Sequence, residues 1–360
     1  MKLRLLVRVC PVLLILTLIF AGGCASKQTQ APGQGGQETQ KSQDVIKLKY
    51  ACTYQETEEG AMIGYKFCDY VEEKSGGRVK FERYPGGVLG GPPEVLRLVS
   101  SGSVDVVSFP HVAFKDEIPL SAIPEWSPGS PEKAVEYFNK IFLEIPETSA
   151  LLEQEAKEHN IKYLNFVSGG SNAFVSKKEV NSLADFKGKK LGAGAAQEAF
   201  AKLGVTVVNV TPPDIYEDFS RGIIDITHMG FGPTVQLKWY EVAKCWVFDG
   251  TYTAGNPITV NLDTWNKLPS DIQQIFIEGA KAASDYSIEL TKSTKEQNIQ
   301  TLKNAGAVVK ELSPEDAKQW FQNIFEYGKN DMLERATKAG KADQAKTVLK
   351  YVDDLLGISQ

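Results

Sequence analysis

The sequence predicts an α/β fold with two lobes, and three observations support this prediction. Segments in which apolar and polar residues alternate, as in strands, are separated by segments with apolar residues at helical spacing. A helix-then-strand unit occurs twice, at 92–106 and 212–226, with Pro-Pro-acid at its start and Ser, Gly and Asp at matching offsets. A very long helical pattern runs from 268 to 306. Helices between strands favour mostly parallel sheets covered by helices.

The first half of the folded chain is predicted to alternate between strands and helices. We expect strands at 45–53, 78–84 and 104–108, with helices at 58–75 and 92–101. Proline in a first turn, an acid beside it and a glycine at the end are typical helix boundaries. In sheets of this kind ligands bind beyond the carboxyl ends of the strands.

The second half repeats this alternation after a proline-rich segment and a long helical pattern that reaches residue 160. Expected strands are 161–167, 173–176, 189–193, 205–210 and 223–227, with helices at 181–188, 195–203 and 212–222. The chain then returns through a helix at 234–244, strands at 245–250 and 258–261, the long helix, and helices beginning near 314 and 341. We therefore assign 46–168 and about 254–285 to lobe I, and 169–253 and about 286–360 to lobe II with the C-terminal helices.

The N-terminus has the features of a secretion signal. Three positive charges precede an apolar run at 9–21, which is shorter than the about 20 residues that span a bilayer. Small residues lead directly into Cys24, as in the lipobox of bacterial lipoproteins, although Ala21 stands where Leu is usual. We expect 1–24 to be a lipoprotein signal with an acylated Cys24; an ordinary signal peptide cleaved elsewhere is the alternative.

Residues 25–45 are rich in Gln, Gly, Ser and Lys, which predicts a flexible tether. The folded part is then extracytoplasmic, in the periplasm or at the cell surface, and anchored to a membrane by lipid. Removing the three positive charges of 1–23 lowers the formal net charge from -5 to -8. An acidic chain without a basic cluster argues against nucleic-acid binding.

Three cysteines remain after the signal and Cys24. They are Cys52, Cys68 and Cys245. An odd number of cysteines does not pair completely within one chain, so buried thiols are favoured, with a Cys52–Cys68 bridge as the alternative.

Six short motifs occur in order along the chain. They are SGGRVK at 75–80, YPGGVLG at 84–90, SGSVD at 101–105, LADFKGKKL at 183–191, YEVAK at 240–244 and LPSDIQ at 268–273. Together they resemble the solute-binding proteins of TRAP transporters, of the DctP type, over nearly all of 46–335. The resemblance implies a two-lobed periplasmic-binding-protein-like fold, type II-like, with a long shared helix. It also implies small and large membrane subunits that move the solute with a sodium gradient.

One difference from this family concerns how a ligand is held. Most members carry an Arg, which grips a ligand carboxylate in two parallel bonds, at the position of Gly192. A second basic position corresponds approximately to Asn172, and 228–231 replaces an expected Asn or acid. The ligand then lacks a carboxylate, or other donors such as Asn172, backbone N–H groups and His228 hold it, or the alignment is shifted. We favour the first two, because no Arg occurs from 98 to 220.

The strand ends and the resemblance together predict the ligand contacts, because aromatic walls with a few polar groups suit a small-molecule cleft. The predicted contacts are Tyr54, Gln55, Phe109, His111, Trp126, Phe166, Asn172, Phe174, Gly192, His228, Met229, Phe231, Tyr252 and Asn256. Core packing is the alternative for each aromatic residue. His111 and His228 have no carboxylate beside them at ligand spacing, so we expect no metal and no cofactor.

These patterns favour binding over catalysis. The chain contains no Gly-x-Ser-x-Gly, no His-Glu-x-x-His and no phosphate loop, and Ser171 is better explained by a turn. We expect a monomeric solute-binding protein, not an enzyme, that delivers a small organic solute to a TRAP-type transporter by lobe closure. The solute is an organic acid or an aromatic or neutral analogue. The alternatives are a solute-sensing lipoprotein of a membrane signalling system and, less favoured, a surface-anchored enzyme.

Overall fold

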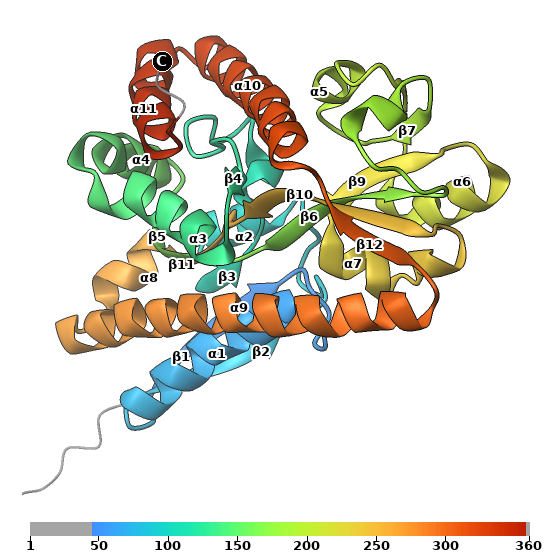
Figure 1. The fold of residues 1–360 in the computed structure, drawn as a ribbon. Coiled ribbons are helices and arrows are strands. Elements are labelled where there is room, and N and C mark those ends of the chain that lie inside the picture. The colour runs from blue at the N-terminus through green and yellow to red at the C-terminus, as the bar shows by residue number, and fades with distance from the viewer. Residues whose placement is uncertain (1–44, 358–360) are drawn as a thin grey trace, which may run out of the picture. The chain divides into compact units, whose positions relative to one another are not determined.

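The computed structural model describes residues 45–357, which lie within one compact unit, and their strands form two sheets (Figure 1). The first sheet has the order β2-β1-β3-β11-β5. Its strands are β1 (Ile46–Cys52), β2 (Val79–Tyr84), β3 (Val106–Ser108), β5 (Ile161–Val167) and β11 (Asn256–Asn261). The signal, the tether and Cys24 lie outside the described residues.

The second sheet has the order β12-β10-β6-β9-β7-β8, with β4 also paired to β10. Its strands are β4 (Trp126–Pro128), β6 (Gly170–Ser176), β7 (Lys190–Gly192), β8 (Thr206–Val208), β9 (Ile226–Gly230), β10 (Cys245–Thr253) and β12 (Val308–Glu311). The two-sheet α/β architecture confirms the predicted fold class. The pairing is more mixed than expected, because β5, β6 and β11 lie antiparallel to their neighbours, and β10 is antiparallel to β4 and β6 but parallel to β12.

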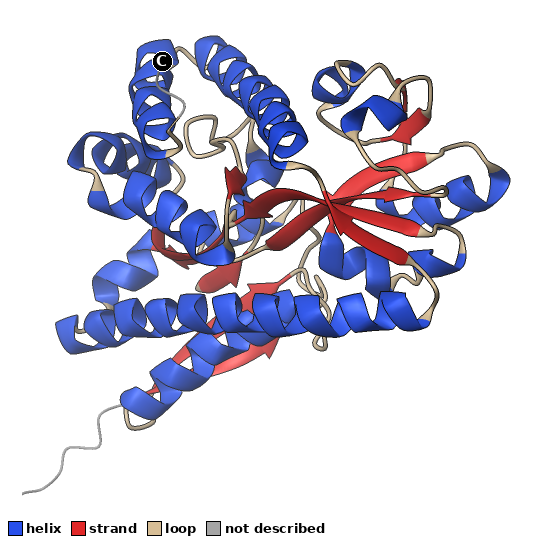
Figure 2. Cartoon of the chain, viewed as in Figure 1, coloured by secondary structure: helices blue, strands red, loops and turns tan. Residues whose placement is uncertain are grey.

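Helices lie beside both sheets (Figure 2). The α-helices are α1 (Glu59–Lys74), α2 (Val95–Ser100), α3 (Pro131–Asn139), α4 (Pro146–Glu158), α5 (Gln197–Ala201), α6 (Ile215–Arg221), α7 (Phe231–Gln236), α8 (Leu262–Lys267), α9 (Ser270–Asn304), α10 (Pro314–Lys338) and α11 (Ala342–Leu355). Short turns of 3-10 helix are η1 (His111–Phe114), η3 (Leu183–Phe186), η4 (Pro212–Asp214) and η5 (Trp239–Glu241), and η2 (Lys140–Glu144) is a π-helix. Within 45–357 no helix is long and apolar enough to cross a membrane.

Several elements differ from the sequence-based expectation. The helical pattern before residue 160 is divided into α3, η2 and α4, because Pro146 cannot donate a helical hydrogen bond and begins a new helix. Strand β9 extends to Gly230, so His228 and Met229 lie within a strand and not after it. The helix expected at 234–244 begins at Phe231 and ends at Gln236. Strand β12 and helix α8 were not predicted.

The repeated Pro-Pro units have the same construction in both sheets. Each helix ends next to a glycine with positive φ, 72° at Gly102 and 69° at Gly222, a conformation that favours glycine. The matching acids then bond the neighbouring parallel strand: Asp105 accepts from the Lys49 N–H at 2.8 Å, and Asp225 from the Lys190 N–H at 3.0 Å. The repeated Asp therefore fixes each new strand beside an existing one.

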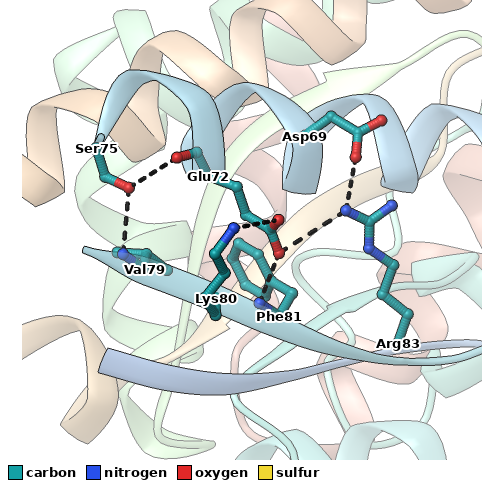
Figure 3. Close-up of polar contacts among 7 residues, drawn as sticks. All are labelled: Asp69, Glu72, Ser75, Val79, Lys80, Phe81 and Arg83. Carbon is teal, nitrogen blue, oxygen red and sulfur yellow. Dashed lines mark hydrogen bonds and ion pairs between the residues drawn. The ribbon is translucent and has the colours of Figure 1, made fainter. Parts of the chain in front are cut away.

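The segment between α1 and β2 shows how an edge strand is held (Figure 3). The Glu72 carboxylate accepts from the Phe81 N–H at 2.8 Å and pairs with Lys80 at 3.3 Å. Arg83 pairs with Asp69 at 2.6 Å. Because β2 is the outermost strand of its sheet, these side chains cover backbone groups that another chain would otherwise pair with.

Helix α9 runs past both sheets and holds the connection between β5 and β6. It contacts α1 and β5 on one side and α7 and β12 on the other (Figure 1). Buried hydroxyl groups on one face bond the crossing chain: Ser284 donates to the Phe166 carbonyl at 2.7 Å, and Ser287 accepts from the Ser168 N–H at 2.8 Å. Thr291 donates to the Ser168 hydroxyl at 3.0 Å. The backbone N–H of Ser168 and the carbonyl of Phe166 therefore find their hydrogen-bond partners on α9.

The cysteines Cys52, Cys68 and Cys245 are buried free thiols. This confirms the interpretation that they pack in the core, and no bridge joins Cys52 to Cys68.

Replacement of Ser287 by Ala should destabilise the protein. The Ser168 N–H would lose its partner at a site where both residues are buried, which costs about 1–3 kcal/mol of the free energy of unfolding. Denaturant unfolding measures this loss. The control is Ser293→Ala, on an exposed position of the same helix; equal losses for the two variants would contradict the role assigned to Ser287.

Candidate functional site

Two cavities are lined by segments that connect the two sheets. The first, which we call the Tyr54 cavity, has a volume of about 150 Å³ and is lined by Tyr54, Glu59, Ser171, Phe231, Asn256 and Lys295, among others. The second, the Glu125 cavity, has a volume of about 270 Å³. Its wall includes 122–126, which lead into β4 of the second sheet, 193–196 after β7, and residues of α10. Tyr54 follows β1 and 193–196 follow β7, so each cavity includes one strand end, as expected for an α/β binding site.

The Tyr54 cavity is built around a hydrogen bond between segments distant in the sequence. The Asn256 side chain, at the start of β11, donates to the Tyr54 hydroxyl at 2.9 Å. Burial raises the pKa of Tyr54 to about 12, so this group is a neutral hydroxyl at physiological pH. Burial also raises the pKa of the Glu59 carboxyl. The cavity thus offers neutral polar groups beside a partly desolvated acid.

Lys295 of α9 supplies the cation of this cavity. Its ammonium group lies 4.0 Å from the Phe248 ring centroid and 5.4 Å from that of Tyr252, and it donates to the Tyr252 hydroxyl at 3.2 Å. Aromatic faces attract a cation in this arrangement. Tyr252 therefore positions Lys295, and with Asn172 it lines an adjoining recess.

The Glu125 cavity combines aromatic walls with separated charges. Trp126, Phe200 and Tyr327 line it. At one part of the wall Asp331 pairs with Arg335 at 2.7 Å and with Lys115 at 3.3 Å, so the two cations are both bound to one acid.

Glu125 itself is unpaired. Among residues 45–357 its carboxylate has no hydrogen bond and no ion pair. It lies beside the β10–β11 connection, where a Cβ added to Gly255 would be 3.6 Å from its Oε2 atom. Burial raises the pKa of Glu125 to about 7.

Beneath this cavity lies a buried hydrogen-bond network that includes His228 and Asn172, two residues predicted to donate to the ligand. The Asp249 carboxylate pairs with His228 Nε2 at 2.7 Å and accepts from Trp320 Nε1 at 2.9 Å. It also accepts from the Thr251 N–H at 2.8 Å and hydroxyl at 2.9 Å, and the Asn172 side chain donates to that hydroxyl at 3.0 Å. A buried carboxylate requires such donors. These polar atoms of His228 and Asn172 are therefore engaged within the protein.

The structure separates the other predicted contacts into cavity-lining and core positions. Tyr54, Phe231 and Asn256 line the Tyr54 cavity, and Trp126 and His228 line the Glu125 cavity. Gln55 is exposed near Gly86, and Met229 is half-buried against a core cluster. Four are completely buried, with packing as their evident role: Phe109, His111, Phe166 and Phe174.

His111 illustrates why such a residue belongs to the core. Its Nδ1 atom donates to the Gly255 carbonyl, and its ring contacts Phe138, Phe142 and Phe166. Burial lowers the pKa of His111 to about 4, so the ring is neutral. Within 45–357 no group of three or more His, Cys, Asp or Glu is arranged to hold a metal ion.

Gly192 lines neither cavity. A Cβ at this position would lie 3.0 Å from both Ile224 and Val210, which belong to a packed core cluster. The side-chain direction at Gly192 therefore leads into the core and not toward a ligand.

Three groups of cavity residues were not predicted. These are Glu125, Lys295 and the Lys115–Asp331–Arg335 cluster. Glu125 and Lys115 come from the proline-rich segment, Lys295 from α9, and Asp331 and Arg335 from α10. Only Glu125 had a local signal, because it is a single acid within the apolar stretch 122–126. Lys295, Asp331 and Arg335 are brought to the site by helix packing alone.

The pH dependence of stability tests the state of Glu125. Because its folded-state pKa is about 7 and its ordinary value is 4.5, the folded protein binds this proton more tightly, and stability falls as pH rises through that window. Between about pH 5 and about pH 8 the free energy of unfolding of the unchanged protein should fall by on the order of 1–3 kcal/mol more than that of the Glu125→Gln variant. Denaturant unfolding of both proteins measures this. If the free energy of unfolding depends on pH in the same way in both proteins, the Glu125 carboxyl is not desolvated.

Comparisons with known proteins agree with this architecture. The model of the family described as bacterial extracellular solute-binding protein, family 7, matches residues 53–333. A solute-binding protein of Sulfitobacter sp. (strain NAS-14.1) is 26% identical over 67% of this chain and 73% of its own length. The ectoine-binding periplasmic protein TeaA of Halomonas elongata is 24% identical over 84% and 90%, respectively.

Solved structures share the fold. An extracytoplasmic solute receptor of Bordetella pertussis that binds pyroglutamic acid superimposes with a TM-score of 0.66 at 21% identity, covering 86% of this chain and 99% of its own. The family match extends over most of the folded chain. This chain therefore belongs to the DctP family, family 7 of the bacterial extracellular solute-binding proteins.

Proposed function

We propose that this protein is an extracytoplasmic receptor that binds a small organic solute between two lobes and delivers it to the small and large membrane subunits of a TRAP-type transporter. The observation that carries the proposal is the Tyr54 cavity, which is lined by elements of both sheets, together with the Glu125 cavity beside the second sheet. Lobe I comprises 46–168 and about 254–285, and lobe II comprises 169–253 and about 286–360. Cys24 anchors the monomer to the membrane through lipid, and 25–45 is its tether.

Closure of the lobes is the step that this arrangement favours. The chain passes directly between the sheets at Ser168–Gly170 and again at 253–256, and it also connects them through β4 and through α9, which leads to β12. Gly170 has a φ of 96°, which other residues rarely adopt. Rotation about the two direct connections narrows the Tyr54 cavity. The C-terminal helices do not contact lobe II alone, because α11 packs on α4 of lobe I.

The relatives bind small polar solutes, including ectoine and pyroglutamic acid. Our proposed solute is of similar size, an organic acid or an aromatic or neutral analogue. Its contacts are the cavity-lining members of the predicted set, together with Glu125 and Lys295.

A solute that binds should raise the melting temperature of the purified protein and be recovered unchanged. Binding to the folded state alone stabilises it by about 2.7 kcal/mol at a hundredfold excess over Kd. Thermal-shift measurements across a library of organic acids, amino acids and aromatic solutes provide the test, with mass spectrometry of the solute afterwards. Chemical turnover of the bound solute would overturn the receptor assignment. Tight binding of succinate would contradict the inference from Gly192.

A further inference from the structure

Glu125 occupies a fixed position in its cavity. The carbonyl of Pro124 accepts from the Tyr137 hydroxyl at 3.0 Å, and a Cβ at Gly328 of α10 would lie 3.1 Å from the Pro124 side chain. On the other side Trp126 begins β4 and pairs with Thr253. The acid therefore stands between two residues held by packing and hydrogen bonds.

The segment that leads to Glu125 is anchored as well. Glu155 of α4 is buried and accepts from the Leu120 N–H at 3.0 Å and the Ser121 N–H at 2.7 Å. Lys341 pairs with the same carboxylate at 3.1 Å. The loop is thus shaped before any ligand binds, which lowers the entropy cost of recognition.

No described group bonds the Glu125 carboxylate. Lys115 and Arg335 line the same cavity, but both pair with Asp331 and neither pairs with Glu125. Tyr54 and His111 lie near Glu125, the first as a neutral phenol and the second as a neutral imidazole. Tyr327 and His228 also line the cavity, and His228 is paired with Asp249. A desolvated carboxylate without a partner is costly, and a positive charge that enters the cavity removes this cost.

The remaining walls also suit a cation. Trp126, Phe200 and Tyr327 line the cavity, and aromatic rings attract positive charge when water is excluded. An anionic group near Glu125 would instead meet a like charge.

Resting on the proposed function, we propose that the Glu125 cavity receives the cationic end of the solute, an ammonium or similar charged nitrogen group that donates to the Glu125 carboxylate. The solute is therefore an amine or a zwitterion and not a simple dicarboxylate. In a zwitterion, the anionic end lies away from Glu125.

The test compares two probes of nearly equal size and opposite charge, phenethylamine and 3-phenylpropionate, titrated into the full chain in detergent. We expect the amine to bind at least about tenfold more tightly, as a charge-assisted hydrogen bond predicts. Glu125→Gln should abolish this preference and Glu125→Asp should keep part of it. The matched control is Glu117→Gln, an exposed acid of the same loop, which should leave the preference unchanged.

The fold of Glu125→Gln is checked by its melting temperature at about pH 8, which should equal or exceed that of the unchanged protein because an unpaired charge is removed. Equal or reversed preference between the probes, or binding of neither, overturns the inference. If a library solute raises the melting temperature of Glu125→Gln as much as that of the unchanged protein, the role of Glu125 is overturned but the receptor function is not. If no solute raises the melting temperature of the unchanged protein, both proposals are overturned.

Discussion

The crossing between the two sheets is the constraint on which the rest of the structure depends. At this point the chain leaves one sheet before it can pair in the next, so its backbone groups need other partners. Ser287 and Ser284 of α9 supply them, on consecutive turns of one helix face. A helix of 35 residues extends about 52 Å at 1.5 Å per residue, so one rigid element reaches both sheets. The crossing is therefore held in place by α9.

Three buried or partly buried acids show how differently this fold treats a carboxylate. Asp249 is surrounded by donors from Trp320, Thr251 and His228. Glu155 receives two backbone N–H groups and a lysine. Both are structural, because their full complement of partners fixes neighbouring segments. Glu125 lies between two residues that are held by packing and hydrogen bonds, yet its carboxylate has no partner among the described residues. This contrast with Asp249 and Glu155 is the reason that we propose a ligand contact for Glu125.

Much of the fold could be predicted from local signals, and less of the site. The Pro-Pro units identified two helix-strand pairs because proline, glycine and Asp act within a few residues of their own position. The choice between core and cavity for Phe109, Phe166 and Phe174 depended on what packs against them, which the local pattern does not contain. His228 was predicted as a ligand donor, but its partner Asp249 is 21 residues away on another strand. Lys295 and Arg335 reach the site only because α9 and α10 pack there.

Gly192 and Glu125 bear differently on the charge of the ligand. Gly192 ends β7 of the second sheet, and its side-chain direction is filled by Ile224 and Val210, so a side chain at this position would enter the core and not a cavity. Glu125 comes from the loop between β3 and β4 and owes its position to Tyr137 and α10. The positive group that we propose for the ligand therefore depends on Glu125, whose carboxylate lies in a cavity with aromatic walls and has no bonded partner among the described residues.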